Sequence, residues 1–282
     1  MTTDIVCVAD GDRISLGVAL NILVARKSSP NARFLVALPE GADFGSAVAE
    51  DVITTFAHQI IRIPAPTTVL DGKLYRIENK INALSVCGIK RAILVDSDIL
   101  FIRPLPESFL IRESPAAVPE HGKHEFPWDR LYPLVGLKRP EIEILLGSWE
   151  ICDPWFNAGF VACPDAEQLG HVWRMMADFV FRCPWVPERW PYLDQISLPL
   201  AMAQLSPGRT VQHSNVLPAR FNQNVFNWSE DQSYVRNGFV LHHHNKVRLI
   251  ERYFPLLIMW IRDGYPIVDK VVDELRRFDE DE

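Results

Sequence analysis

The chain has 282 residues, of which 48% are hydrophobic and 23% are charged. This composition is typical of a soluble globular protein, and the length allows one large domain or two of ordinary size. The net charge of -7 and the absence of a Lys/Arg cluster argue against a protein that binds the phosphate backbone of nucleic acids.

The first hundred residues alternate short β-rich runs with helical patterns. The helix expected at 12–29 has Asp12 as its N-cap, and the helix expected at 74–88 ends at Gly88, a residue typical of helix C-caps. This alternation predicts an α/β fold with a mixed, mostly parallel sheet flanked by helices. Strands are predicted at 5–9, 33–38, 60–63 and 92–95, and helices at 12–29, 45–59 and 74–88.

The pattern is looser after residue 104. Two runs there are strand-like, 211–218 and 238–245, and 194–204 is expected to form a helix that Pro199 shortens or kinks. No internal repeat or linker interrupts the chain, so one continuous domain is expected. Six of the eight tryptophans fall between residues 128 and 190, at positions 128, 149, 155, 173, 185 and 190.

Several features bear on the cellular compartment. The N-terminus has Asp4 where a secretory signal would have basic residues, and the apolar run at 254–261 is far shorter than the ~20 residues that span a bilayer. We therefore expect a cytoplasmic protein without a transmembrane segment, although it could lie against a membrane surface. The five cysteines form no C-x-x-C pair and indicate free thiols: Cys7, Cys87, Cys152, Cys163 and Cys183.

Two carboxylates follow the strand AILV (92–95). Residues i and i+2 of an extended chain share a side, so Asp96 and Asp98 can converge while Ser97 points away. Ligands of open α/β sheets bind beyond the carboxyl ends of the strands, and a divalent cation relieves the repulsion between two carboxylates. The D-x-D pair could instead only end the strand. A functional D-x-D pair is typical of metal phosphatases, in which one Asp is the nucleophile, and of nucleotide-sugar transferases. Its position about a hundred residues into the chain favours the transferase.

A run of three histidines, 242–244, follows the apolar stretch FVL. Imidazole nitrogen is a suitable third ligand for Mn²⁺ beside two carboxylates. Lys246 and Arg248 come next and could meet the same diphosphate. The alternative is a solvated surface run, which the preceding apolar residues disfavour.

Five short motifs occur in the order seen in glycosyltransferase family 8, and the chain resembles its glycogenin-like and lipopolysaccharide galactosyltransferase-like members. The resemblance spans roughly residues 5–250 and implies the GT-A fold. The motif around the D-x-D pair includes Lys80, sixteen positions before Asp96. The five motifs are VADGD (8–12), the block 79–101, FNAGF (156–160), YLDQ (192–195) and HHHNKVR (242–248).

The resemblance implies a metal-dependent hexosyltransferase that uses a nucleoside diphosphate sugar, UDP-glucose or UDP-galactose, and retains the anomeric configuration. Asp96, Asp98 and His242 would hold Mn²⁺ or Mg²⁺, with His244 as the alternative to His242, because the two share a face of an extended chain. Residues 1–104 would form the nucleotide-binding half of a single catalytic domain, 105–262 the acceptor and sugar half, and 263–282 a helical or frayed acidic tail. Ala9, Asp10 and Asp12 would bind the nucleoside.

The sugar and the diphosphate have their own implied residues. Asp194, Gln195 and Asn157 would be the catalytic positions at the sugar. Lys80, Ser97, Gly159, Asn245, Lys246 and Arg248 would complete the donor site. Retention would follow either from a covalent intermediate on Asp194 or from front-face attack, which we favour.

The sequence departs from the family pattern at three positions: Arg13 replaces an aromatic residue, Asn245 a glycine and Leu249 a proline. Each assignment also has a plain structural alternative. Lys80 could be a surface lysine, Asn157 with Gly159 a simple turn, and Asp194 a helix N-cap, while the tryptophans could be core residues and not acceptor-stacking ones. A non-catalytic nucleotide-sugar binding protein, or a metal phosphatase or nucleotidyltransferase, remains as the alternative function. The acceptor, whether carbohydrate, lipid-linked or protein, is not identified.

Overall fold

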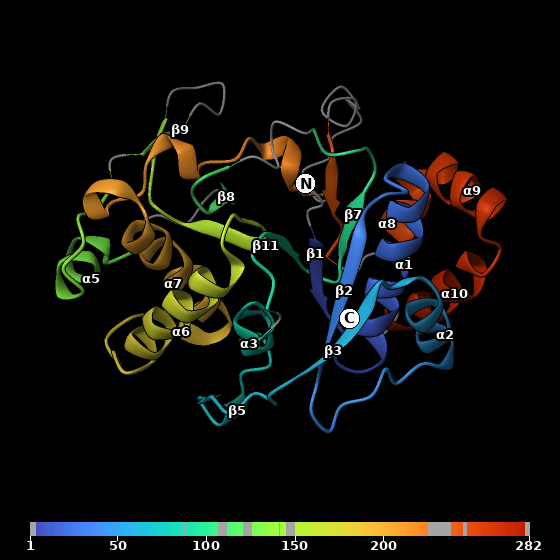
Figure 1. Cartoon of the computed structure of the whole chain (residues 1–282), viewed down its shortest axis with the longest axis horizontal. Coiled ribbons are helices and arrows are strands. Elements are labelled where there is room, and N and C mark those ends of the chain that lie inside the picture. The colour runs from blue at the N-terminus through green and yellow to red at the C-terminus, as the bar shows by residue number, and fades with distance from the viewer. Residues whose placement is uncertain are drawn as a thin grey trace.

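A six-stranded mixed sheet forms the centre of the molecule (Figure 1). The computed structural model describes residues 4–86, 88–106, 112–120, 126–140, 142–144, 150–224, 238–244 and 247–279. Four neighbouring strands, β3, β2, β1 and β6, run parallel, and β11 is antiparallel to its neighbours β6 and β8. The predicted α/β fold with a mostly parallel sheet is therefore confirmed. In spatial order the strands are β3 (Gln59–Ile63), β2 (Arg33–Pro39), β1 (Asp4–Val8), β6 (Ala92–Val95), β11 (Phe156–Cys163) and β8 (Ala116–Pro119).

The central strands are apolar on both faces because helices cover both faces of the sheet. Alternate residues of β1 enter two separate cores, so Ile5 and Cys7 pack in one and Val6 in the other. Phe34 and Leu35 of β2 divide in the same way. Continuous apolar runs such as AILV thus serve two cores at once.

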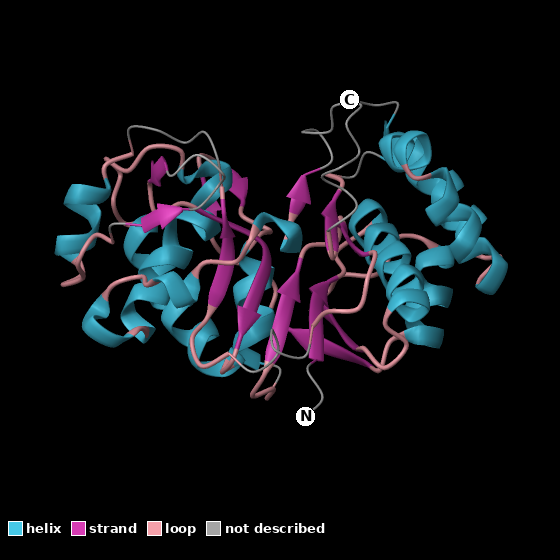
Figure 2. Cartoon of the chain, turned by 90° about the horizontal axis from the view of Figure 1, so that it is seen from above, coloured by secondary structure: helices cyan, strands magenta, loops and turns pink. Residues whose placement is uncertain are grey.

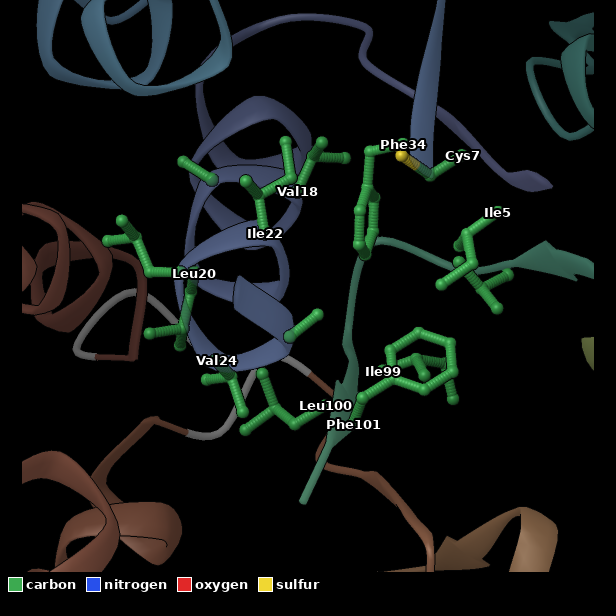
Figure 3. Packing of buried hydrophobic residues seen from close by; sticks show 14 of the residues in the cluster. Ile5, Cys7, Val18, Leu20, Ile22, Val24, Phe34, Ile99, Leu100 and Phe101 are labelled. Atoms are coloured by element: carbon green, nitrogen blue, oxygen red, sulfur yellow. The ribbon is translucent and has the colours of Figure 1, made fainter. Parts of the chain in front are cut away.

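Helices lie on both sides of the sheet and give three layers (Figures 1 and 2). In Figure 3, Val18 and Ile22 point from α1 toward Phe34 of β2. Among the described residues, no helix combines the length and the apolarity that crossing a bilayer requires. One side carries α1 (Asp12–Ser28), α2 (Ala47–Phe56), α8 (Val247–Tyr253), α9 (Pro255–Gly264) and α10 (Val268–Asp279); the other carries α3 (Glu78–Val86), α5 (Trp128–Leu134), α6 (Ala166–Phe181) and α7 (Arg189–Leu205).

Smaller sheets complete the fold. The hairpin of β4 (Val69–Leu70) and β5 (Lys73–Leu74) precedes α3. A three-stranded sheet contains β12 (Gln223–Asn224), β13 (Val240–His242) and β7 (Ile99–Phe101), and β9 (Ile142–Ile144) pairs with β10 (Glu150–Cys152). The C-terminal helix α10 buries Val268, Val271, Val272 and Leu275 in the core that also contains α1.

The structure corrects three predictions. The run 211–218 is not a strand: it contains a 3-10 turn, His213–Asn215, and a single bridge from Val216 to Ala117. Asp12 is not the N-cap of α1, because Gly11, at φ 79°, takes that position and Asp12 is the first helical residue. Pro199 does not end its helix, since α7 continues to Leu205.

The tryptophan prediction is also corrected in part. Trp128, Trp155 and Trp173 are at most 1% exposed and pack in one core, so their indoles cannot stack on a sugar at the surface. Trp149 lies outside the described residues.

Glu78 binds the backbone of the loop that precedes the β4–β5 hairpin. Its buried carboxylate accepts hydrogen bonds from the backbone N–H groups of Thr67 and Thr68 at 3.1 and 2.8 Å and pairs with Arg174 of α6. Burial alone would raise the pKa of Glu78, but the Arg174 guanidinium and the Thr68 N–H together lower it below its usual value. The loop, α3 and α6 are therefore joined through one carboxylate.

We expect Glu78→Gln to lower the free energy of unfolding at pH 7 by about 1–3 kcal/mol, because buried donors lose a charged acceptor. The depressed pKa means that this stabilisation is present above the unfolded value of about 4.3 and is lost as pH falls through the folded value. Urea denaturation at pH 7 and at pH 3 should thus show a smaller difference between the variant and the natural protein at the acid pH. Glu167→Gln, at an exposed ion pair of α6, is the control. An equal loss in both variants would contradict the role of Glu78.

Candidate active site

The D-x-D residues form a tight turn between β6 and β7. Asp96 ends the pairing with β11 by donating its backbone N–H to the Gly159 carbonyl at 2.9 Å. Helix α1 passes directly behind the turn: a Cβ on Gly17 would lie 2.6 Å from the Ser97 carbonyl oxygen, so only glycine fits there. Ser97 and Asp98 are buried. A core strand and the backbone of a core helix therefore fix the turn from two sides.

A second sheet brings the histidines to this turn. Strand β13 runs antiparallel to β7 and pairs His242 with Ile99, and the His243 N–H donates to the Asp98 carbonyl at 3.0 Å. His242 Nε2 lies 3.2 Å from Asp98 Oδ1. β13 ends at His242, and His244 has φ 51°, so the expected extended geometry of the run is wrong at His244. The rings of His242 and His244 nevertheless stack, with centroids 3.9 Å apart.

The protonation states follow from this burial and pairing. Burial alone would raise the pKa of Asp98 and lower the pKa of His242. The attraction between the two charged groups outweighs burial, so the pKa of Asp98 lies well below its usual range and the pKa of His242 lies above its usual range. Burial lowers the pKa of His244 to about 4, which leaves its ring neutral at pH 7. His243 is fully buried, and burial also lowers its pKa to about 4.

These side chains fit a divalent metal. One ligand atom from each of Asp98, His242 and His244 lies within 4.8 Å of the others. A carboxylate with two imidazoles is a donor set that can hold a divalent transition-metal ion. The two histidines that the sequence left as alternatives thus both reach the cluster, whereas Asp96 lies beside it and contacts Lys80.

Lys80 bridges two carboxylates. Its Nζ lies 2.6 Å from Asp96 Oδ1 and 3.3 Å from Asp194 Oδ2, and 17% of its side chain is exposed. Burial would lower the pKa of Lys80, but the charges of Asp96 and then Asp194 raise it well above its usual value. Burial raises the pKa of Asp96, against the opposing effect of Lys80. Lys80 is therefore not a surface lysine, and it joins the motif YLDQ to the D-x-D turn.

Asp194 is not an N-cap. It lies within α7, whose N-cap is Glu188, and both of its carboxylate oxygens have side-chain partners, Tyr75 at 2.9 Å and Lys80 at 3.3 Å. Gln195, the next residue, accepts a hydrogen bond from Trp155 Nε1 at 2.7 Å.

The FNAGF motif borders the same place. A Cβ on Gly159 would lie 3.0 Å from His242 Cε1 and 3.2 Å from Asp96 Oδ2. Glycine at this position therefore allows β11 to approach both of these side chains. Asn157 accepts from the Gly159 N–H at 2.7 Å and donates to Glu120 Oε2 at 2.6 Å. Sequence reasoning missed Glu120, because it follows β8 without any motif of its own. Only the pairing of β8 with β11 places it here.

A cleft of about 280 Å³ opens in front of the turn. Asp10 lies at this cleft, where its carboxylate accepts from Asn79 Nδ2 at 3.2 Å and lies 3.9 Å from the Arg76 guanidinium. Sequence reasoning gave no role to Arg76, which lies outside every motif, or to Asn79, which is the first residue of the block 79–101. The cleft is lined by Val8, Asp10, Ile14, Arg76, Ile77, Asn79, Lys80, Val95, Asp96, Ser97 and Asp98.

Other predicted residues lie apart from this cleft or outside the described residues. Ala9 is fully buried, and Asp12 is exposed and faces Gly45. Arg248 is exposed on α8. Asn245 and Lys246 lie outside the described residues.

The structure is similar to solved structures of glycosyltransferases. The chain is similar to the apo structure of the bifunctional glycosyltransferase WbbM, with a TM-score of 0.58 and 10% identity over 97% of this chain and 52% of that one, so it spans about half the length of WbbM. It is also similar to an active-site mutant of LgtC (TM-score 0.56, 14% identity, 86% of this chain and 87% of that one). For the glycosyltransferase GlyE of Streptococcus pneumoniae TIGR4 the TM-score is 0.56, with 11% identity over 99% of this chain and 64% of that one. These likenesses show the GT-A fold.

The family of the chain follows from its sequence. No curated protein matches it. Residues 5–206, more than half of the chain, match the Rhodobacterales glycosyltransferase domain. This match includes β1, the D-x-D turn, FNAGF and YLDQ. The chain therefore belongs to the Rhodobacterales glycosyltransferase family.

Proposed function

We propose that this glycosyltransferase moves a hexosyl group from a nucleoside diphosphate sugar, UDP-glucose or UDP-galactose, to a hydroxyl of an acceptor, as a member of glycosyltransferase family 8. The observation that carries the proposal is the single cleft that Asp10, Lys80, Asp96 and Asp98 line together. Asp98 lines this cleft and also belongs to the Asp98–His242–His244 cluster. An anionic diphosphate can bind among carboxylates only if cations accompany it.

Each part of the donor has residues suited to it. Asp10 would bind the nucleoside, and Asn157 with Gly159 would border the sugar. Asp98, His242 and His244, beside Asp96, would hold Mn²⁺ or Mg²⁺, which supplies positive charge to the leaving diphosphate. Ser97 and Lys80 would contact the donor directly. Asn245, Lys246 and Arg248 would approach the diphosphate from the segment after β13.

Transfer breaks the bond between the anomeric carbon and the β-phosphate oxygen, and the electron pair leaves with the diphosphate. We infer front-face attack, in which the acceptor hydroxyl forms the new bond on the same side and its proton passes to the departing phosphate, with retention of configuration. The buried Asp194 supports this route, because Tyr75 and Lys80 engage its two carboxylate oxygens. Such a carboxylate is better suited to stabilise positive charge on the sugar, with Gln195, than to form a covalent bond.

The test is incubation of the protein with Mn²⁺ and either UDP-glucose or UDP-galactose while UDP release is followed. We expect slow hydrolysis of one donor that stops when EDTA removes the metal and resumes when Mn²⁺ is restored. Binding of UDP-sugar without any turnover would indicate a non-catalytic binding protein. Absence of donor binding, together with phosphate release from a monoester, would refute the transferase and favour a phosphatase.

A further inference from the structure

Tyr75 is a buried residue of the site that no motif contains. It lies between β5 and α3 and is 1% exposed. Its backbone N–H donates to the Thr68 carbonyl at 2.8 Å, and its ring meets that of Trp190 edge-to-face with centroids 5.8 Å apart. Thr68 is itself held by Glu78. The phenol is thus fixed in position before any substrate binds.

The hydroxyl of Tyr75 holds Asp194 at two points. It lies 2.9 Å from Asp194 Oδ1, and it accepts the backbone N–H of Asp194 at 2.9 Å. It is also 3.1 Å from the Pro191 carbonyl oxygen. A phenol has one proton, and the charged carboxylate is the stronger acceptor of the two oxygens. The hydroxyl therefore fixes both the carboxylate and the backbone of Asp194.

The two oxygens of Asp194 have different kinds of partner. Oδ1 receives a neutral hydroxyl, and Oδ2 receives the ammonium of Lys80. Because the hydroxyl satisfies Asp194 without adding charge, Lys80 can remain shared with Asp96 at 2.6 Å. Without the hydroxyl, the carboxylate would have Lys80 as its one remaining side-chain partner among the described residues, and it could turn both oxygens toward the ammonium. Lys80 would then move away from the D-x-D turn.

We propose that Tyr75 is a positioning residue of the transferase: its hydroxyl orients Asp194 and thereby keeps Lys80 at Asp96 and the donor. The inference rests on the proposed function. Tyr75 does not act as a base, because burial, and after it the charge of Asp194, raises the pKa of its phenol well above the usual value. Its contribution is a hydrogen bond that is in place before the reaction begins.

The test is Tyr75→Phe, which removes one oxygen atom and leaves the ring in place. We expect UDP release in the presence of Mn²⁺ to fall in kcat by about 10- to 100-fold, as loss of a hydrogen bond to a charged group predicts. The dissociation constant of the UDP-sugar, measured by calorimetry, should change less than threefold. A crystal structure of the variant should show the Asp194 carboxylate rotated and Lys80 farther from Asp96.

Tyr132→Phe is the matched control. Tyr132 is also fully buried, and its hydroxyl has no hydrogen-bond partner among the residues that the structure describes. This variant should keep the kcat of the natural protein. A general effect of losing a buried hydroxyl would lower kcat in both variants and would overturn the proposal.

Two other results would overturn it as well: an unchanged kcat in Tyr75→Phe, or an Asp194 carboxylate that keeps its position in the crystal structure of that variant. The natural protein reports separately on the proposed function. If it releases no UDP, that function fails, and the position of Asp194 in the two crystal structures still decides whether Tyr75 orients it.

Discussion

Asp98→Ala should abolish Mn²⁺ binding and lower UDP release by at least about a hundredfold, because loss of a ligand exceeds the 10–100-fold cost of losing a group that only supports one. Asp98 contributes an oxygen to the cluster and also pairs with His242 at 3.2 Å. Its removal therefore deletes one ligand and releases a second. Calorimetric titration with MnCl₂ and the UDP-release assay measure the two effects.

Single variants of the histidines refine this prediction. His242→Ala and His244→Ala should each weaken Mn²⁺ binding, since both rings offer a nitrogen within 4.8 Å of the Asp98 oxygen. Asp263→Ala, at an exposed ion pair with Lys27, is the control and should bind Mn²⁺ as the natural protein does. Undiminished Mn²⁺ affinity in Asp98→Ala would show that the metal binds elsewhere. If only one histidine variant lost affinity, the three-ligand set would be wrong.

The sequence predicted the first half of the fold well because its signals are local. Strand β6 reads as AILV, and each residue of that run is buried. The larger helices and strands up to residue 95 differ in periodicity and were predicted, but the β4–β5 hairpin was not, and α3 begins at Glu78 and not at residue 74. By contrast, 211–218 resembles a strand in composition, but it forms a single bridge with β8 and otherwise turns. Strand propensity depends on a partner strand, and a local pattern does not reveal the partner.

The site was harder to predict because its contacts are long-range. The D-x-D pair and the histidines could be named from their composition, but their meeting depends on the antiparallel pairing of β7 with β13. His244 reaches the cluster with a positive φ, a backbone conformation that few residue types adopt and that no sequence motif predicted. The contacts of Asp194 with Lys80 and with Tyr75 require α7 to lie correctly against α3 and the segment before it. Glu120 and Arg76 were missed for the same reason.

Lys80→Met should destabilise the fold and disable the site together. The substitution keeps a long apolar stem but leaves the buried Asp194 and the mostly buried Asp96 without the ammonium that lies between them. Loss of one partner of a buried ion pair costs about 3 kcal/mol or more. We expect a loss of that size in the free energy of unfolding from urea denaturation at pH 7, and UDP release at least about a hundredfold slower.

A double-mutant cycle separates the ion-pair effect from the loss of packing. Asp194→Asn alone leaves Lys80 paired with Asp96 and should cost less stability than Lys80→Met. In the double variant one of the two stranded carboxylates is gone, so it should be more stable than the sum of the single losses predicts, by about 1 kcal/mol or more. Activity should stay low in all three variants, because the sugar end of the site needs both groups. Strict additivity of the two stability losses would mean that Lys80 and Asp194 do not interact in solution, and the link between YLDQ and the D-x-D turn would then have to be abandoned.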